Sequence, residues 1–302
     1  AAFDCLTRQD VLDYHASRYV PNNVVLSIAG DVDAAEILSH LELLVEDLKS
    51  RPLNREPIPH EPHQFGSRRV RKEFAVPYSK LHLAWRLPCS AHPDTPALSA
   101  LSSILGGGRS ARFYEKFHDR LGLVYSIEVH SNQSETDEGA FTISMDVDRA
   151  QRDKVRDLVL QELRNLAEED FTEDLKRVCK QTRVSRLRRR SSASGVASEM
   201  GADWFGSRNL NLSSEWQEAI ERVTTEDLHR VCSTWLSSPN VTEVSLDPPG
   251  SNAGDEERAS ASAGTALSEH VLGNGMKVVI REDHRLPLAY ACMAFKAGCR
   301  AE

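Results

Sequence analysis

The residues whose types and spacing could do chemistry lie in the stretch 95–145. Three consecutive glycines, Gly106, Gly107 and Gly108, end an apolar helix pattern there. Glycine lets backbone or ligand approach closely, and a helix that starts after it leaves free N–H donors. The alternative is a helix stop followed by a tight turn. A phosphate-binding loop is excluded, because it needs Gly-Lys-Ser/Thr and Gly108 is followed by Arg-Ser.

Elsewhere the sequence offers no second reactive cluster. The six cysteines are scattered with no C-x-x-C pair, which indicates free thiols and mildly favours a reducing compartment. His60 and His63 form H-E-P-H, but Pro62 opposes the helical turn that would bring two imidazoles onto one face. We therefore expect neither a metal site nor a thiol nucleophile in these segments.

The composition is that of a globular chain. Its 302 residues, 40% hydrophobic and 27% charged, suggest about two domains. No run of about 18 apolar residues occurs, so we expect a soluble protein without a membrane span, and we expect no signal peptide. The net charge of −8 argues against general affinity for nucleic acid. The arginine-rich run 183–190 lacks interleaved aromatics, and we interpret it as the solvated end of a long helix.

Two helices and several strands must position the glycine stretch. Helices are predicted before the glycines and over about 110–120, followed by strands that begin at LGLVYS and at 140–145. The earlier segment LHLAWRL (81–87) places its leucines and tryptophan on one face and His82 on the other. A further strand is predicted over 69–75.

Segments 6–28 and 224–246 follow one pattern: a threonine cap, an amphipathic helix, Pro-Asn and a short Val-rich strand. Their offset is about 217 to 218 residues, which indicates two related domains that end alike. In the first copy the strand Val24–Ala29 is of the kind buried on both faces, and a helix is predicted over 34–48.

Between the two copies the sequence is mainly helical. Apolar residues at three- and four-residue steps predict a helix over 149–169, and a second helix starts at about Thr172. Beyond it we expect Trp204, Phe205 and Trp216 to pack in a core.

Two linkers divide the chain. Residues 51–65 hold four prolines, and residues 248–266 are rich in Gly, Ser and Ala. We therefore predict the end of one domain at 1–50, a complete domain at 66–247 and the first strands of another at 267–302. The last of these begins with a hairpin around an Asn-Gly turn.

The stretch LGGGRSARFYEKFHDRLGLVYS resembles the core motif of C-type domains in the pitrilysin/insulinase (inverzincin) family of zinc metallopeptidases. That family includes the mitochondrial processing peptidase, and the resemblance covers nearly everything except the two linkers. It implies an α+β, metalloprotease-like (LuxS/MPP-type) fold of two layers, with a mixed, mainly antiparallel sheet packed on helices. It also assigns 1–50 and 267–302 to N-type domains and 66–247 to one complete C-type domain.

The family's metal motif, H-x-x-E-H on a helix, is missing from this sequence. Glu269-His270 is the only Glu-His pair, and Ala266 stands where the first histidine would be. The resemblance therefore implies zinc for the full-length protein but not zinc bound by this chain, which should be inactive alone.

The resemblance implies a substrate-binding role instead. In active members the C-type domain offers an Arg and, seven residues later, a Tyr that hold the substrate backbone and help stabilise the tetrahedral intermediate. Tyr125 matches the Tyr, and His118 stands at the Arg position without the charge and fork of guanidinium. The alternative is that Tyr125 packs at the strand start and His118 lies on a solvated helix face. The candidate substrate-binding residues are Tyr125, His118, Gly106, Gly107 and Gly108.

Two functions follow from the resemblance. The first is a fragment of a zinc metalloendopeptidase that degrades or processes peptides, with a peptide substrate and the other peptidase half as partners. KAGCRAE (296–302) favours it, because it resembles the lead-in to the zinc helix of active halves. The alternative is a non-catalytic scaffold or partner subunit of the same family, which His118 in place of Arg favours.

Overall fold

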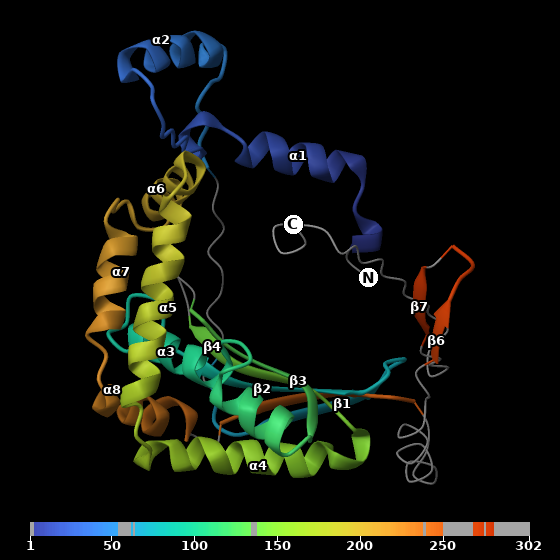
Figure 1. Ribbon diagram of the computed structural model, residues 1–302. Coiled ribbons are helices and arrows are strands. Elements are labelled where there is room, and N and C mark those ends of the chain that lie inside the picture. Colours follow the sequence, from blue (N-terminus) through green and yellow to red (C-terminus); the bar gives the residue numbers. More distant parts are fainter. Residues whose placement is uncertain are drawn as a thin grey trace.

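The computed structural model describes most of the chain (Figure 1). The described residues are 3–53, 62, 64–133, 138–237, 240–249, 268–274 and 276–280. Within these ranges, no helix combines the length and apolar character needed to cross a membrane.

A five-stranded mixed sheet forms the centre of the fold, as the sequence predicts. Its strand order is β1-β5-β2-β4-β3, with β1 parallel to β5 and all other neighbours antiparallel. The strands are β1 (Arg68–Glu73), β2 (Ser79–Leu87), β3 (Val124–Asn132), β4 (Gly139–Val147) and β5 (Thr242–Asp247).

Helices cover one face of this sheet and build a second wall beside it. Figure 1 shows α4 along one face of the sheet, whereas α5 and α6 rise beside the sheet. The helical elements of this part are α3 (Thr95–Gly106), η3 (Tyr114–Arg120), η4 (Arg149–Gln151), α4 (Arg152–Asn165), η5 (Leu166–Glu168), α5 (Thr172–Arg190), α6 (Ala193–Ser207), α7 (Leu212–Glu221), α8 (Thr225–Val231) and η6 (Cys232–Leu236).

The side chains of β2 alternate between the two faces of the sheet, and its apolar residues lie on the face that the helices cover. Leu81, Leu83 and Trp85 are at most 2% exposed, and they lie opposite Met145, Ile143 and Phe141 of β4. Apolar residues from two strands therefore form one buried surface against the helices. The alternate residues on the other face of the sheet are half-buried or exposed and mostly polar, and we call this the open face. Its central residues are Lys80, His82, Ala84 and Arg86 of β2, Thr142, Ser144 and Asp146 of β4, and Ser126, Glu128 and His130 of β3.

The strand predicted over Val24–Ala29 does not form. Helices α1 (Arg8–Arg18) and α2 (Ala34–Val45) are present, but the segment between them pairs with no strand of the described residues. The exposure of its side chains still alternates: Val24 and Leu26 are exposed, whereas Ser27 is half-buried. The Ser27 hydroxyl donates a hydrogen bond to the Ala197 carbonyl of α6 at 2.7 Å. The prediction was wrong because a strand needs neighbours for its backbone hydrogen bonds, whatever its sequence.

Two of the three aromatics predicted in a core lie outside it. Trp204 is 39% and Phe205 65% exposed, whereas Trp216 packs against the core as predicted. The inner face of α6 carries Glu199 and Asp203, which are buried. Successive helical residues are about 100° apart, so the aromatics directly after Asp203 point away from that face.

Near the end of the chain, the predicted hairpin is present. Strands β6 (Ser268–Val271) and β7 (Lys277–Ile280) pair antiparallel, with Ser268 opposite Ile280. The rest of the segment predicted to hold the first strands of another domain, 281–302, lies outside the described residues.

Candidate functional site

Tyr125 occupies an irregular position at the start of β3. Val124 pairs with Val147 and Ser126 with Asp146, so two steps along β3 match one step along β4 and Tyr125 is the extra residue of a β-bulge. A bulge of this kind re-aims a side chain out of the regular alternation. Val124 is buried in the core, whereas Tyr125 is 44% exposed. Tyr125 is therefore held beside the core but not within it.

Two contacts of the Tyr125 side chain with other described residues help to orient it. Its hydroxyl donates a hydrogen bond to Asp148 Oδ1 at 2.9 Å. Its ring lies 4.0 Å from the Tyr78 ring, centroid to centroid, at an interplanar angle of 33°. Asp148 directly follows β4 and Tyr78 directly precedes β2, so three strand ends position one aromatic pair.

His118 lies in the π-helical turn η3, and its ring is engaged by its own helix. Its Nδ1 is 2.7 Å from Asp119 Oδ1, and its Nε2 is 3.5 Å from the Tyr114 hydroxyl. The Tyr114 ring stacks on it with centroids 4.4 Å apart. A half-exposed imidazole whose two nitrogens lie near local partners cannot offer a substrate the paired N–H donors of an Arg guanidinium.

The glycine stretch has a structural explanation at each position. A Cβ on Gly106 would come within 2.6 Å of the Val129 backbone nitrogen, and one on Gly107 within 2.4 Å of the Ser103 carbonyl oxygen. Gly108 has φ +100°, which favours glycine. Gly106 thus lets α3 approach β3, and the next two residues end the helix. These contacts agree with the alternative interpretation of a helix stop and tight turn.

The structure does not bring all candidates into one cluster. Gly106 faces Val129, which points into the core, whereas Tyr125 lies four residues earlier and largely outside it. Four strand residues span roughly 13 Å. His118 and Tyr125 are separated by the turn at Gly122, which has φ +59°. Tyr125 is therefore the candidate with an accessible side chain next to the open face.

Sequence reasoning missed the polar partners on and beside the open face. His82 Nδ1 is 2.8 Å from the Ser144 hydroxyl, and burial lowers the pKa of His82, which favours its neutral form. Lys80 pairs with Asp146 at 2.9 Å. Asp148 was also missed, because only the bulge brings it to Tyr125, and a bulge leaves no mark in a single sequence.

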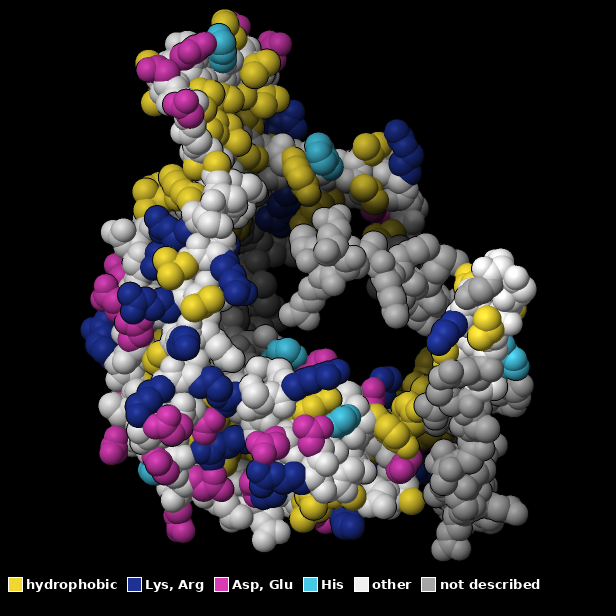
Figure 2. All heavy atoms as spheres, viewed as in Figure 1, with side chains coloured by type: hydrophobic (Ala, Val, Ile, Leu, Met, Phe, Trp, Pro, Cys, Tyr) yellow, Lys and Arg dark blue, Asp and Glu magenta, His cyan; other side chains and the backbone are white. Residues whose placement is uncertain are grey.

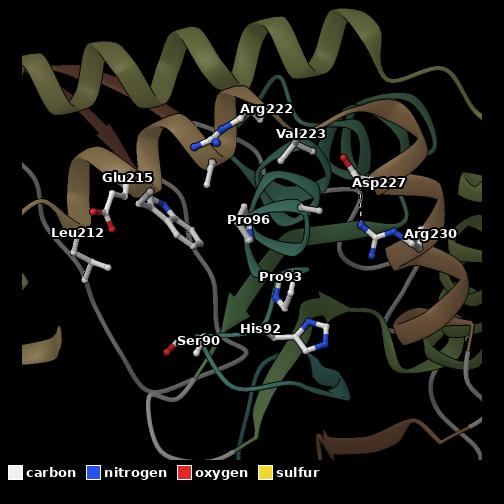
Figure 3. A pocket seen from close by; sticks show the side chains of 14 residues that line it. Ser90, His92, Pro93, Pro96, Leu212, Glu215, Arg222, Val223, Asp227 and Arg230 are labelled. Atoms are coloured by element: carbon white, nitrogen blue, oxygen red, sulfur yellow. Dashed lines mark hydrogen bonds and ion pairs between the residues drawn. The ribbon is translucent and has the colours of Figure 1, made fainter. Parts of the chain in front are cut away.

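A separate pocket of about 480 Å³ lies between the loop before α3 and the helices α7 and α8. Figure 3 shows Leu212 and Glu215 of α7 at the left, His92 and Pro93 below the centre, and Arg230 at the right, where it is linked to Asp227. None of the candidate residues lines it.

Beside this pocket, Asp94 links the start of α3 to the α8–η6 segment. It accepts a hydrogen bond from Trp235 Nε1 at 2.9 Å and a second from Arg230. Burial raises the pKa of Asp94, but the bonds from Trp235 and Arg230 outweigh it, so that pKa lies below its usual value. This charged contact is structural, since both donors come from the α8–η6 segment.

The described residues do not fit a zinc site. They contain no group of three or more His, Cys, Asp or Glu side chains that could hold a metal ion. His270, from the only Glu-His pair, lies in the strand β6 and not on a helix. No catalytic step through a metal can therefore be derived from this chain's described side chains.

Comparison with known proteins agrees with the architecture. A zinc protease named PqqE from Helicobacter pylori is 24% identical over 250 residues, 80% of this chain and 55% of its own length. A mitochondrial-processing peptidase subunit alpha-2 from Dictyostelium discoideum is 26% identical, over 77% of this chain and 53% of its own. The chain thus spans about half the length of the curated relatives it matches.

Solved structures share the fold. A Helicobacter pylori protease gives a TM-score of 0.71 at 24% identity, over 81% of this chain and 60% of that chain. A peptidase M16 inactive domain from Pseudomonas fluorescens gives 0.69 at 20% identity, over 82% and 58%. The model of the peptidase M16 inactive domain matches residues 6–181, more than half of the sequence. The chain therefore belongs to the family of peptidase M16 inactive domains.

Proposed function

We propose that this chain supplies the non-catalytic, peptide-facing domain of a zinc-dependent metalloendopeptidase. The catalytic half would lie in the same longer chain or in a partner subunit. The relatives named as zinc proteases support this assignment, as does the match to an inactive domain of the same family. Zinc would belong to the other half.

The observation that carries the proposal is the position of Tyr125. It is 44% exposed, at a bulge beside the open face, with its ring and hydroxyl held by Tyr78 and Asp148. A residue that only packed the strand start would be buried, as Val124 is. Figure 2 shows the molecule hollowed between the sheet and the N-terminal helices, which is where an unfolded peptide would lie.

The same proposal assigns the flanking segments to neighbouring N-type domains. Residues 3–53 would be the end of the preceding one, since apolar residues such as Leu26, Leu43 and Leu44 are at least 63% exposed there. Such a surface calls for a partner. The hairpin β6–β7 would open the following N-type domain, and 66–247 would be the complete C-type domain.

A scaffold or partner-subunit role is the second candidate, and His118 favours it. Both of its ring nitrogens lie near Asp119 and Tyr114 of its own helix. If Tyr125 alone faces the substrate, the domain would bind peptides without aiding their hydrolysis.

The test measures cleavage of a quenched fluorescent unfolded peptide by the full-length protein. We expect cleavage that a chelator abolishes and zinc restores. Tyr125→Phe should lower kcat/KM about tenfold, the cost of one hydrogen bond that involves a charged group. Asp157→Asn, an exposed carboxylate of α4 on the other face of the sheet, is the control and should leave it unchanged.

The outcomes separate the two candidates. Peptide binding without any cleavage would replace the peptidase assignment with the scaffold. Cleavage unchanged by Tyr125→Phe would remove Tyr125 from the substrate contact.

A further inference from the structure

We infer that the outer face of α5 binds an anionic lipid surface, with its cations on the lipid phosphates and two apolar side chains between them. This face lies outside the candidate site, so the inference is independent of the proposed function. Three features of α5 support it: its division into two faces, the charge left uncompensated on one of them, and the apolar side chains within that charge.

Helix α5 is divided into two faces of opposite character. An inner stripe, buried or half-buried beside α3, α6 and α7, consists of Leu175, Val178, Cys179, Thr182 and Arg186. An outer stripe, exposed throughout, consists of Lys180, Arg183, Val184, Leu187 and Arg188. Residues three and four positions apart share one side of a helix, so each stripe is a continuous surface. The fold therefore uses the inner stripe and leaves the outer stripe to a partner.

The outer stripe carries positive charge that the protein does not neutralise. No carboxylate of the described residues pairs with its three cations, Lys180, Arg183 and Arg188. On the other side of the same helix, Arg186 and Arg190 both bind Glu199, at 3.0 and 2.8 Å. Residues 175–190 contain no Asp or Glu, although the net charge of the chain is −8. An anionic partner is therefore attracted to this face and repelled by much of the rest.

The spacing of these cations fits an array of phosphates. Residues 180–188 extend over about 12 Å along the helix axis. A guanidinium binds a phosphate through two parallel N–H donors, and an ammonium adds a point charge. Cations spread over this length match a row of lipid headgroups better than a single free phosphate. Clusters of Lys and Arg on a helix are typical of proteins that bind anionic lipid.

Two apolar side chains lie within the charged stripe. Leu187 is 62% and Val184 38% exposed, and both fall between Arg183 and Arg188 in sequence. Over α5, Figure 2 shows hydrophobic side chains between those of Lys and Arg. A lipid surface can bury such side chains below its headgroups while it binds the cations. The phosphate array of a nucleic acid gives them no apolar contact, and the stripe has no aromatic ring to stack on bases.

The test measures co-sedimentation of the full chain with sucrose-loaded vesicles. One set is phosphatidylcholine alone, and the other is two parts phosphatidylcholine to one part phosphatidylglycerol. We expect binding to the anionic vesicles to be at least about tenfold tighter, with a difference that shrinks as salt rises. Inorganic phosphate should displace the chain no better than chloride at equal ionic strength, which separates a lipid surface from a free phosphate as the ligand.

Variants of the outer stripe test the surface directly. Replacement of all three cations, Lys180→Gln, Arg183→Gln and Arg188→Gln, should weaken binding to anionic vesicles about a hundredfold, since each cation contributes about fivefold. Leu187→Ala alone should weaken it about threefold, because less apolar surface is buried. These side chains are exposed, so far-UV circular dichroism and the urea midpoint should stay those of the parent.

The matched control removes the same charge from exposed positions elsewhere. Arg8→Gln in α1, with Lys154→Gln and Arg164→Gln in α4, should change vesicle binding less than about twofold. An equal loss in this control would mean that net charge, and not the stripe, drives binding. Equal binding to both vesicle types, or binding to neither, would overturn the inference. Tighter binding to a DNA duplex than to vesicles, lost in the stripe variants, would replace the lipid surface with nucleic acid.

Discussion

The two copies of one sequence pattern, 6–28 and 224–246, both form a capped helix but differ in how that helix packs and in whether a strand follows it. Thr7 and Asp10 form a capping box, with the Thr7 N–H 2.8 Å from Asp10 Oδ2. Thr224 and Asp227 form the same box at 3.0 Å. Capping uses only residues three apart, so it needs no tertiary partner.

Beyond the cap the copies diverge. Leu228 and Val231 of α8 are fully buried, and β5 pairs with β1 on one side and β2 on the other. Helix α1 has no buried residue, and residues 24–29 pair with no described strand. The comparison teaches that the pattern specifies a helix by itself and a strand only when a sheet is present to receive it.

The largest expected effect is on the free energy of unfolding, because only the helix of the second copy packs in a core. Leu228→Ala, in α8, should lower the free energy of unfolding by about 2–5 kcal/mol, because it leaves a cavity in the core. The corresponding residue of α1 is Val11, 59% exposed, and Val11→Ala should change it by less than about 0.5 kcal/mol. Urea unfolding followed by circular dichroism measures both. Equal losses would mean that α1 is packed in solution and that the contrast is false.

A smaller effect tests the charged anchor that only the second copy has. Asp94→Asn should lower stability by about 1–3 kcal/mol at pH 7, because Arg230 loses its charged acceptor. The folded pKa of Asp94 lies below the usual value of an aspartate, so its contribution is present above about pH 4 and is lost as pH falls through the folded value.

The urea midpoints of the parent and Asp94→Asn should therefore converge below about pH 4. Arg230 corresponds to Asp13 of the first copy, where no such anchor can form. Asp13→Asn is thus the control, and we expect no pH-dependent difference from it. A difference in urea midpoint between the parent and Asp94→Asn that stays the same into acid would mean that the charge of Asp94 does not contribute to stability.

The same contrast explains how far the sequence could predict the fold. Period-two alternation in β2 gave the buried face correctly, because burial on one face is written in the order of residues. The mixed sheet backed by helices was expected from the family resemblance, and it was confirmed. Val24–Ala29 has an equally good strand pattern but lacks neighbours, and no single segment encodes their presence.

The candidate site was only partly predictable. Tyr125 was identified through the resemblance, whereas Asp148 and Tyr78 reach it through a bulge and two strand ends that are distant in sequence. Trp204 and Phe205 were assigned to a core from their size alone, but the inner face of α6 belongs to Glu199 and Asp203. Long-range register and helix rotation decide these positions.

The smallest effect tests the one feature that both copies share. Thr224→Ala and Thr7→Ala each remove a side-chain cap, and the loss of such a cap lowers stability by about 1 kcal/mol. In the second copy that loss should appear in global unfolding, since α8 unfolds only with the core. In the first copy it should appear only as faster amide hydrogen exchange in α1, because α1 can fray without opening the domain. A change in global stability from Thr7→Ala as large as that from Thr224→Ala would show that α1 unfolds together with the sheet.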